Sequence, residues 1–267
     1  MKKILFPIDF STHNASNFQY ALSLADVFEA ELLLLHAFGA PISPDESPDF
    51  EQRASSVVEE LMSFVEEYKP ASSSVKINYE AEVGFAADVI LATAKEAQVD
   101  LIIMGTKGKT NILNRYLGGV STTVMNKANC PLLLIPPAAD FNGLKHFGCT
   151  TNFSFDDLLV LNTLAKWSDK FNTGVTCLHV LVDGEDMSTA EAKVKILKEV
   201  FSAYSIRFQI KSGAIKDAIH LFETEARLGL LGMIHHPKNL IAHLLQGDIT
   251  ESIVSDLKVP LLVFNQD

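Results

Sequence analysis

The chain has 267 residues, which at roughly 150 residues per domain corresponds to about two domains. Hydrophobic residues make up 48% of the chain and charged residues 21%, a composition that supplies a real core and excludes an intrinsically disordered chain. The 33 acidic and 22 basic residues give a net charge of −11, which argues against nucleic acid or an anionic membrane as a partner.

The cysteines and the apolar runs bear on the compartment. Cys130, Cys149 and Cys177 form no CxxC pair and are odd in number, so we expect reduced thiols and no disulfide framework. Pro7 and Asp9 interrupt the first apolar run, which is therefore unlike a signal peptide. No run approaches the roughly 18 consecutive apolar residues of a membrane span. We therefore expect a cytoplasmic protein.

Apolar runs and amphipathic segments alternate along the first half of the chain. In chain order, the pattern predicts a strand at 3–8, a helix at 12–29, a strand at 31–37, a helix at 50–68, a strand at 75–81, a helix at 86–97, a strand at 101–104, a helix at about 120–128 and a strand at 132–135. Ser11 is expected to cap the first helix, and the alternating third strand is expected at a half-exposed sheet edge. Strands that alternate with helices indicate a parallel sheet with helices on both faces.

The second half of the chain repeats the first. Residues 3–38 align with residues 146–181, so that His36 falls on His179, and the second half keeps the same order of elements. A proline-containing linker separates the copies. We therefore expect two doubly wound α/β domains in tandem, at residues 1–139 and 145–267.

A glycine-rich loop follows the fourth predicted strand. Its glycines stand at positions 105, 108, 118 and 119, where they permit positive φ and a close approach of backbone N–H groups to a ligand. The helix that begins near Val120 would direct free N–H groups at such a ligand, and Ser121 and Thr122 could add hydroxyl donors. Residues 101–139 contain four basic residues and no acidic one. The pattern favours a phosphate site over an ordinary loop with solvated lysines. It is not a P-loop, because Ile103 stands where that motif requires glycine.

At these residues the chain resembles the universal stress protein family. The resemblance is carried by Pro-x-Asp-x-Ser after the first strand, Leu-His-Ala at the end of the second, the spacing G-x2-G-x9-G in the loop, and a proline before the fifth strand: Pro7, Asp9, Ser11, Leu35, His36, Ala37, Gly105, Gly108, Gly118 and Pro131. It covers almost the whole chain as a tandem pair. It implies five-stranded sheets in the order 3-2-1-4-5, with strands one and four at the topological switch point where open α/β sheets bind ligands.

The resemblance also implies a site for ATP or another adenine nucleotide in the first domain, with Mg left open. Adenine would lie near Ile8 and Ala37, and Asp9 would accept hydrogen bonds from the ribose hydroxyls. The remaining implied residues flank the ribose and the phosphates: Pro7, Met104, Gly105, Lys107, Gly108, Gly118, Gly119, Val120 and Ser121. The family commonly has Ser or Thr where this chain has Gly119, so AMP or ADP is a candidate ligand beside ATP.

The second copy departs from this pattern. Asn152 replaces Asp9 and Ile234 replaces Gly105. Pro237 removes an N–H at the position of Gly108, and Asp248 places a negative charge at the helix start that should face phosphate. We therefore expect a degenerate second domain with a structural or regulatory role.

The histidines are the remaining candidates for chemistry. His235, His236 and His243 could bind zinc, but no cysteine accompanies them, so we expect no metal site. His36 and His179, at equivalent strand ends, are expected to pack or to bond the backbone and not to catalyse.

Two functions of different classes follow. The first is a stress-response or regulatory protein that binds an adenine nucleotide, with little or no catalysis and at most slow ATP hydrolysis, since no nucleophile or acid–base pair accompanies the loop. The alternative is a scaffold that binds an unknown protein partner and no nucleotide. The apolar strands 131–136 and 260–265 are expected to face each other within one chain, an intrachain pseudo-dimer. A homodimer of chains is left open.

Overall fold

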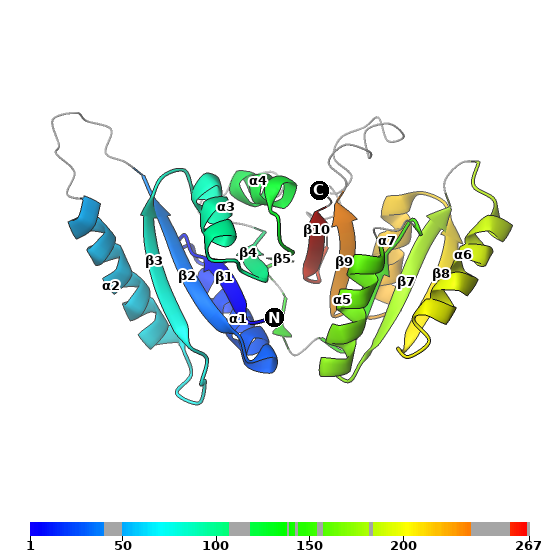
Figure 1. Ribbon diagram of the computed structural model, residues 1–267, viewed down its shortest axis with the longest axis horizontal. Coiled ribbons are helices and arrows are strands. Elements are labelled where there is room, and N and C mark those ends of the chain that lie inside the picture. Colours follow the sequence, from blue (N-terminus) through cyan, green and yellow to red (C-terminus); the bar gives the residue numbers. More distant parts are fainter. Residues whose placement is uncertain are drawn as a thin grey trace. The chain divides into compact units, whose positions relative to one another are not determined.

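The chain folds into two compact units, Met1–Pro137 and Ala138–Asp267, each built on parallel strands that alternate with helices (Figure 1). The computed structural model describes residues 1–39, 50–106, 118–137, 139–141, 144–153, 157–181, 184–235 and 257–265.

The first unit alternates strands with helices throughout. Its elements are β1 (Lys3–Pro7), α1 (Asn14–Phe28), β2 (Glu31–Phe38), α2 (Phe50–Tyr68), β3 (Ile77–Val83), α3 (Ala86–Glu96), β4 (Leu101–Gly105), α4 (Gly119–Lys127) and β5 (Leu132–Ile135). All the strand pairs are parallel, and the order within the unit is β3-β2-β1-β4-β5.

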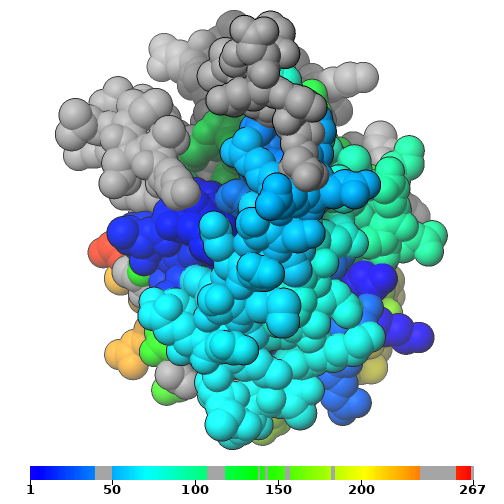
Figure 2. Space-filling view, turned by 90° about the vertical axis from the view of Figure 1, so that its left-hand side faces the viewer, coloured from blue at the N-terminus to red at the C-terminus, as the bar shows by residue number. Residues whose placement is uncertain are grey.

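The core of this unit lies along its central strands. Ile4, Leu5 and Phe6 of β1 are buried in succession, as are Leu101 and Ile102 of β4. Side chains that point to opposite faces of a sheet are both buried only where each face is covered. Helices α1 and α2 contact each other, as do α3 and α4, and the two pairs lie on opposite faces of the sheet (Figure 1). Figure 2 shows the flank of the unit where α2 packs on the edge strand β3.

The second unit repeats this architecture. Its elements are β6 (His146–Thr150), α5 (Asp157–Lys170), β7 (Gly174–Leu181), α6 (Met187–Val200), β8 (Ile206–Ser212), α7 (Ile215–Glu225), β9 (Leu230–His235) and β10 (Leu261–Asn265). The parallel order is β8-β7-β6-β9-β10, the same order of first to fifth strands as in the first unit. The predicted fold class, two doubly wound five-stranded domains in tandem, is confirmed.

Two local predictions were wrong. Strand β3 begins and ends two residues later than expected, a shift that keeps the same side chains on each face because the period is two. Ser11 is not the cap of α1: the helix begins at Asn14, the cap position is His13, and no side chain caps it. The Ser11 hydroxyl instead accepts a hydrogen bond from the Asn14 amide (Oγ···Nδ2 3.1 Å).

No helix in the described ranges is both long and apolar enough to cross a bilayer. Cys130, Cys149 and Cys177 are free thiols, and burial raises the pKa of Cys130 to about 11, so this thiol is protonated at neutral pH.

Candidate functional site

The loop after β1 holds the carboxylate that the sequence singled out. Oδ1 of Asp9 accepts hydrogen bonds from the backbone N–H of Ser11 (3.0 Å) and from Nδ2 of Asn14 (2.5 Å). Asn14 is the first residue of α1 and is only 6% exposed. A buried amide on the helix therefore holds the carboxylate at the end of the strand.

The backbone of this loop turns sharply. Phe10 has a φ of 54°, a left-handed conformation that is uncommon for a bulky side chain, and its ring lies 5.0 Å from the ring of His36. Nδ1 of His36 donates to the carbonyl oxygen of Ile8 (2.7 Å). His36 thus ties the end of β2 to the loop, and the interpretation of His36 as a packing and backbone-bonded residue is confirmed.

The start of α4 forms the second part of the site. Gly118 is the N-cap residue, no side chain among the described residues caps this helix, and the N–H of Gly118 donates to the carbonyl of Thr106 (3.2 Å). The Ser121 hydroxyl donates to the carbonyl of Gly105 (3.1 Å), so its proton is engaged within the protein. The start of α4 can therefore bind an anion through its backbone N–H groups and the helix dipole. The Ser121 hydroxyl does not donate to such an anion while it donates to Gly105.

The expectation of positive φ at Gly118 was wrong. Its φ is −61°, which other residues adopt, and among the described residues a Cβ there would meet the Thr106 carbonyl oxygen alone, at 3.9 Å. A Cβ at Gly119 would have no described atom within 4 Å. The packing of the described residues thus does not require glycine at either position.

The other predicted residues divide by burial. Pro7 ends β1, and the side chains of Ile8 and Met104 are buried, so they can offer mainly backbone to a ligand. Ala37 is half-buried on β2, and Val120 is 39% exposed on α4. Lys107 and Gly108 lie outside the described residues.

The topology brings the Asp9 loop and the α4 start to one edge of the sheet. Strands β1 and β4 are parallel neighbours, in the register Ile4 with Leu101 and Leu5 with Ile102. Asp9, just after β1, and Gly105, the last residue of β4, therefore both lie at the carboxyl ends of these strands. From there the chain leaves β1 toward α1 on one face and β4 toward α4 on the other (Figure 1). This is the switch point of an open α/β sheet. It combines a hydrogen-bond-accepting carboxylate with an uncapped helix N-terminus.

The equivalent loop of the second unit has its carboxylate elsewhere. Asp157, the first residue of α5, is 3% exposed, and its Oδ2 accepts from the backbone N–H of Asn152 (3.0 Å) and from Oγ1 of Thr151 (2.7 Å). Phe153 repeats the left-handed turn with a φ of 59°. The same tether therefore exists in both units. In the second unit, however, the carboxylate belongs to the first residue of the helix, Asp157, and is buried.

His179 repeats the role of His36 and adds a contact. Its Nδ1 lies 2.7 Å from the carbonyl oxygen of Thr151, which confirms the backbone-bonded interpretation, and its Nε2 lies 2.8 Å from Oε2 of Glu185. Both ring nitrogens thus face oxygen acceptors. In the second unit, the carboxylate of Glu185 therefore occupies the outer edge of the His179 ring.

No group of three or more metal-ligating side chains gathers within the described part of the chain. Of the possible zinc cluster, His236 and His243 lie outside the described residues, as does the side chain of His235.

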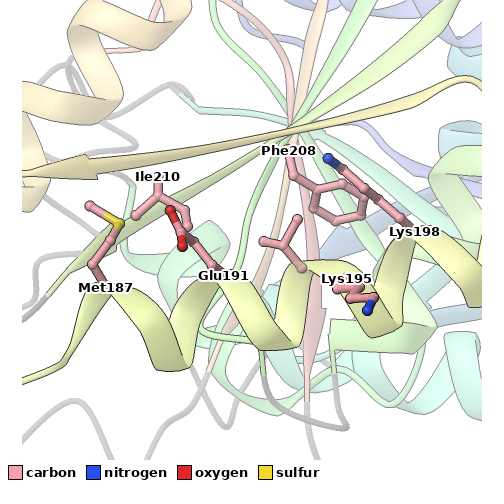
Figure 3. A pocket seen from close by; sticks show the side chains of 7 residues that line it. Met187, Glu191, Lys195, Lys198, Phe208 and Ile210 are labelled. Atoms are coloured by element: carbon pink, nitrogen blue, oxygen red, sulfur yellow. The ribbon is translucent and has the colours of Figure 1, made fainter.

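A groove of about 500 Å³ lies in the second unit, between α6 and the edge strand β8 (Figure 3). Phe208 and Ile210 extend from the strand toward the helix, which contributes Met187, Glu191, Val194, Lys195 and Lys198. Because it lies at the outer strand, this groove is separate from the switch point of its own sheet.

The fold and these loops define a tandem pair of doubly wound α/β domains with switch-point loops. The model of the universal stress protein family matches residues 1–136, and the chain belongs to this family.

Individual proteins agree with this assignment. Universal stress protein MJ0531 of Methanocaldococcus jannaschii is 30% identical over 140 residues, which cover 50% of this chain and 81% of that protein. MJ0577 of the same organism is 28% identical over 152 residues, which cover 50% of this chain and 94% of that protein. A solved universal stress protein from Archaeoglobus fulgidus shares the fold at 20% identity, with a TM-score of 0.79, over 99% of this chain and 96% of its own.

Sequence reasoning missed Asn14 and Asp157. The signal was present in the internal repeat: positions 9 and 14 read Asp and Asn in the first copy, and positions 152 and 157 read Asn and Asp in the second. An exchange of this kind between two positions indicates that the residues at these positions contact each other.

Proposed function

We propose that this universal stress protein binds an adenine nucleotide in its first unit and acts by binding, as a regulatory protein in a stress response. The observation that carries the proposal is the shared position, at one switch point, of the tethered Asp9 carboxylate and the start of α4, whose N-cap residue is a glycine. ATP, ADP and AMP all have the groups that these two elements recognise.

Each element matches one part of the nucleotide. An ionised carboxylate accepts hydrogen bonds from ribose hydroxyls, and the backbone N–H groups at the start of α4 favour an anion such as phosphate. Four basic residues and no acidic ones between 101 and 139 add favourable charge in an otherwise acidic chain. Mg with the phosphates belongs to the same proposal.

Slow or absent hydrolysis fits the chemistry of the described site. Asp9 is held by Ser11 and Asn14, and Ser121 donates to a backbone carbonyl, so neither side chain is arranged as a base beside a nucleophile. The protein would therefore act through nucleotide binding, with slow or absent hydrolysis of the bound nucleotide.

The test begins with the full-length protein as purified. Denaturation and mass spectrometry of the released small molecules should identify ATP, ADP or AMP, and calorimetric titration of the stripped protein should show saturable binding. If no nucleotide is released and none binds with or without Mg, the nucleotide proposal is wrong. The scaffold function would then be the better description.

Three further predictions accompany the proposal. The second unit is a non-binding partner domain, the protein resides in the cytoplasm, and strands 131–136 and 260–265 pair within one chain. Within the described residues, the buried Asp157 and the His179–Glu185 contact support the first of these, because they use the polar groups of the second unit internally.

A further inference from the structure

We infer that Asn14 is a positioning residue that orients the Asp9 carboxylate for ribose recognition and thereby sets the preference for ribonucleotides. This inference rests on the proposed nucleotide site and adds to it a residue that would not touch the ligand.

The geometry fixes one carboxylate oxygen. Two hydrogen bonds, from the Ser11 N–H at 3.0 Å and from Asn14 Nδ2 at 2.5 Å, end on Oδ1 of Asp9. Two donors on one oxygen prevent rotation of the carboxylate, so the direction of Oδ2 is fixed as well. The donor assignment follows from the chemistry, since the amide oxygen of Asn14 would repel a carboxylate oxygen at that distance.

The placement of Asn14 makes it a rigid support. It is buried at the first turn of α1, its backbone N–H donates to the Ser11 carbonyl (3.0 Å), and the same Nδ2 lies 3.1 Å from the Ser11 hydroxyl. One side chain therefore fixes both the carboxylate and the turn that carries it. Ordering these groups before a ligand arrives lowers the entropic cost of binding.

Among the described residues of the second unit, the first residue of the helix does not bond a carboxylate in the loop after the first strand. Asp157, at the position of Asn14, accepts from the backbone N–H of Asn152 and from Thr151. The tether persists there without an Asp9 equivalent, so holding the loop does not require an amide donor. We attribute the amide at position 14 to the charge at position 9.

The experiment compares ATP with 2′-deoxy-ATP and 3′-deoxy-ATP by calorimetry on the full-length protein and its variants. Wild type should bind ATP more tightly than either deoxy analogue. Asn14→Ala should lower ATP affinity about tenfold, the equivalent of one hydrogen bond, and should bring the three affinities close together. Asn17→Ala is the matched control, because Asn17 is a buried asparagine on the same helix and has no measured contact with Asp9.

A double variant, Asp9→Asn with Asn14→Asp, preserves net charge and a polar pair but imposes the arrangement of the second unit. It should keep the wild-type thermal midpoint within a few degrees and lose ribose discrimination. The inference is overturned if Asn14→Ala keeps the wild-type ratio of ATP to deoxy-ATP affinities, if Asn17→Ala lowers that ratio equally, or if the double variant discriminates as wild type does. Absence of binding of ATP, ADP and AMP by wild type would instead refute the proposed function, and the inference with it.

Discussion

Asp9 and Asn152 occupy equivalent positions in the two copies, and their neighbours explain why one of them suits a ligand. Asp9 carries its charge at the end of a strand, where two donors hold it. Asn152 is exposed and contributes its backbone N–H to Asp157, whose charge is buried. The two units thus differ at these two positions, and as a result the carboxylate of Asp9 is half-buried while that of Asp157 is buried.

Replacement of Asp9 should weaken nucleotide binding while replacement of Asn152 should not. Loss of a charge-assisted hydrogen bond to ribose in Asp9→Ala predicts about a tenfold to hundredfold loss of affinity in calorimetric titration. Asn152→Ala, the repeat-matched control, should bind as wild type does. Equal losses in both variants would contradict the assignment of the site to the first unit.

At the scale of elements, periodicity predicted nearly every helix and strand of the first unit, because each amphipathic segment has one apolar face and each buried strand is apolar throughout. The start of α1 was less predictable: Ser11 is a good cap residue, but its hydroxyl bonds the Asn14 side chain. Asp9 and the glycines of the candidate site could be selected from the sequence by their types and spacing. The geometry of the tether through Asn14 could not, since no local pattern specifies the left-handed turn at Phe10; the sequence signal for Asn14 was the exchange of Asp and Asn between the two copies.

The start of α4 should tolerate larger side chains at Gly118 but should then lose its ligand. Gly118 has a φ of −61°, and within the described residues a Cβ there would contact Thr106 O alone, at 3.9 Å, so Gly118→Ala and Gly118→Val should leave the thermal midpoint nearly unchanged. Nucleotide affinity should fall progressively from Gly to Ala to Val, by at least about tenfold for valine, because the side chain enters space beside the phosphates. Undiminished affinity in a folded Gly118→Val protein would show that the phosphates lie elsewhere.

The amino ends of β1 and β4, opposite the site, should give the first unit a measurable acid sensitivity. Burial acts to raise the pKa of Asp100, but the backbone N–H groups of Lys2 and Lys3 donate to its Oδ2 (2.5 and 3.0 Å), and its pKa lies below the usual value. A lowered folded-state pKa stabilises the protein above the unfolded value of about 4, and this contribution is lost as pH falls through the folded pKa.

Asp100→Asn should therefore lower the thermal midpoint at pH 7 by about 1–4 °C, a small effect because the carboxylate is exposed to solvent. The difference from wild type should shrink as the pH is lowered below 4. Glu59→Gln, on the exposed face of α2, is the control and should show no such pH dependence. A destabilisation by Asp100→Asn that is the same at pH 3 and pH 7 would assign the effect to shape instead of charge.

At the scale of the whole molecule, one chain contains two copies of a fold with unequal sites. Both keep the strand order, the left-handed phenylalanine and the histidine that bonds the loop backbone. These shared features maintain the architecture, so they can persist after the ligand is lost. The features that differ, the carboxylate at position 9 and the glycine at position 105, are those that a nucleotide would require.

The chain should accordingly bind one nucleotide, in the first unit. Ile234 of β9 occupies the position of Gly105 of β4, and both residues pair with the fifth strand of their unit, but the isoleucine adds a branched side chain where the first unit has none. The carboxylate of Asp157 is buried among its own donors and is unavailable to ribose. Calorimetric titration of the full-length protein with ATP, ADP and AMP should give a stoichiometry near one per chain, and Asp9→Ala should weaken that single site by the loss given above without revealing a second site. A stoichiometry of two, or a residual site of wild-type affinity in Asp9→Ala, would show that the second unit also binds.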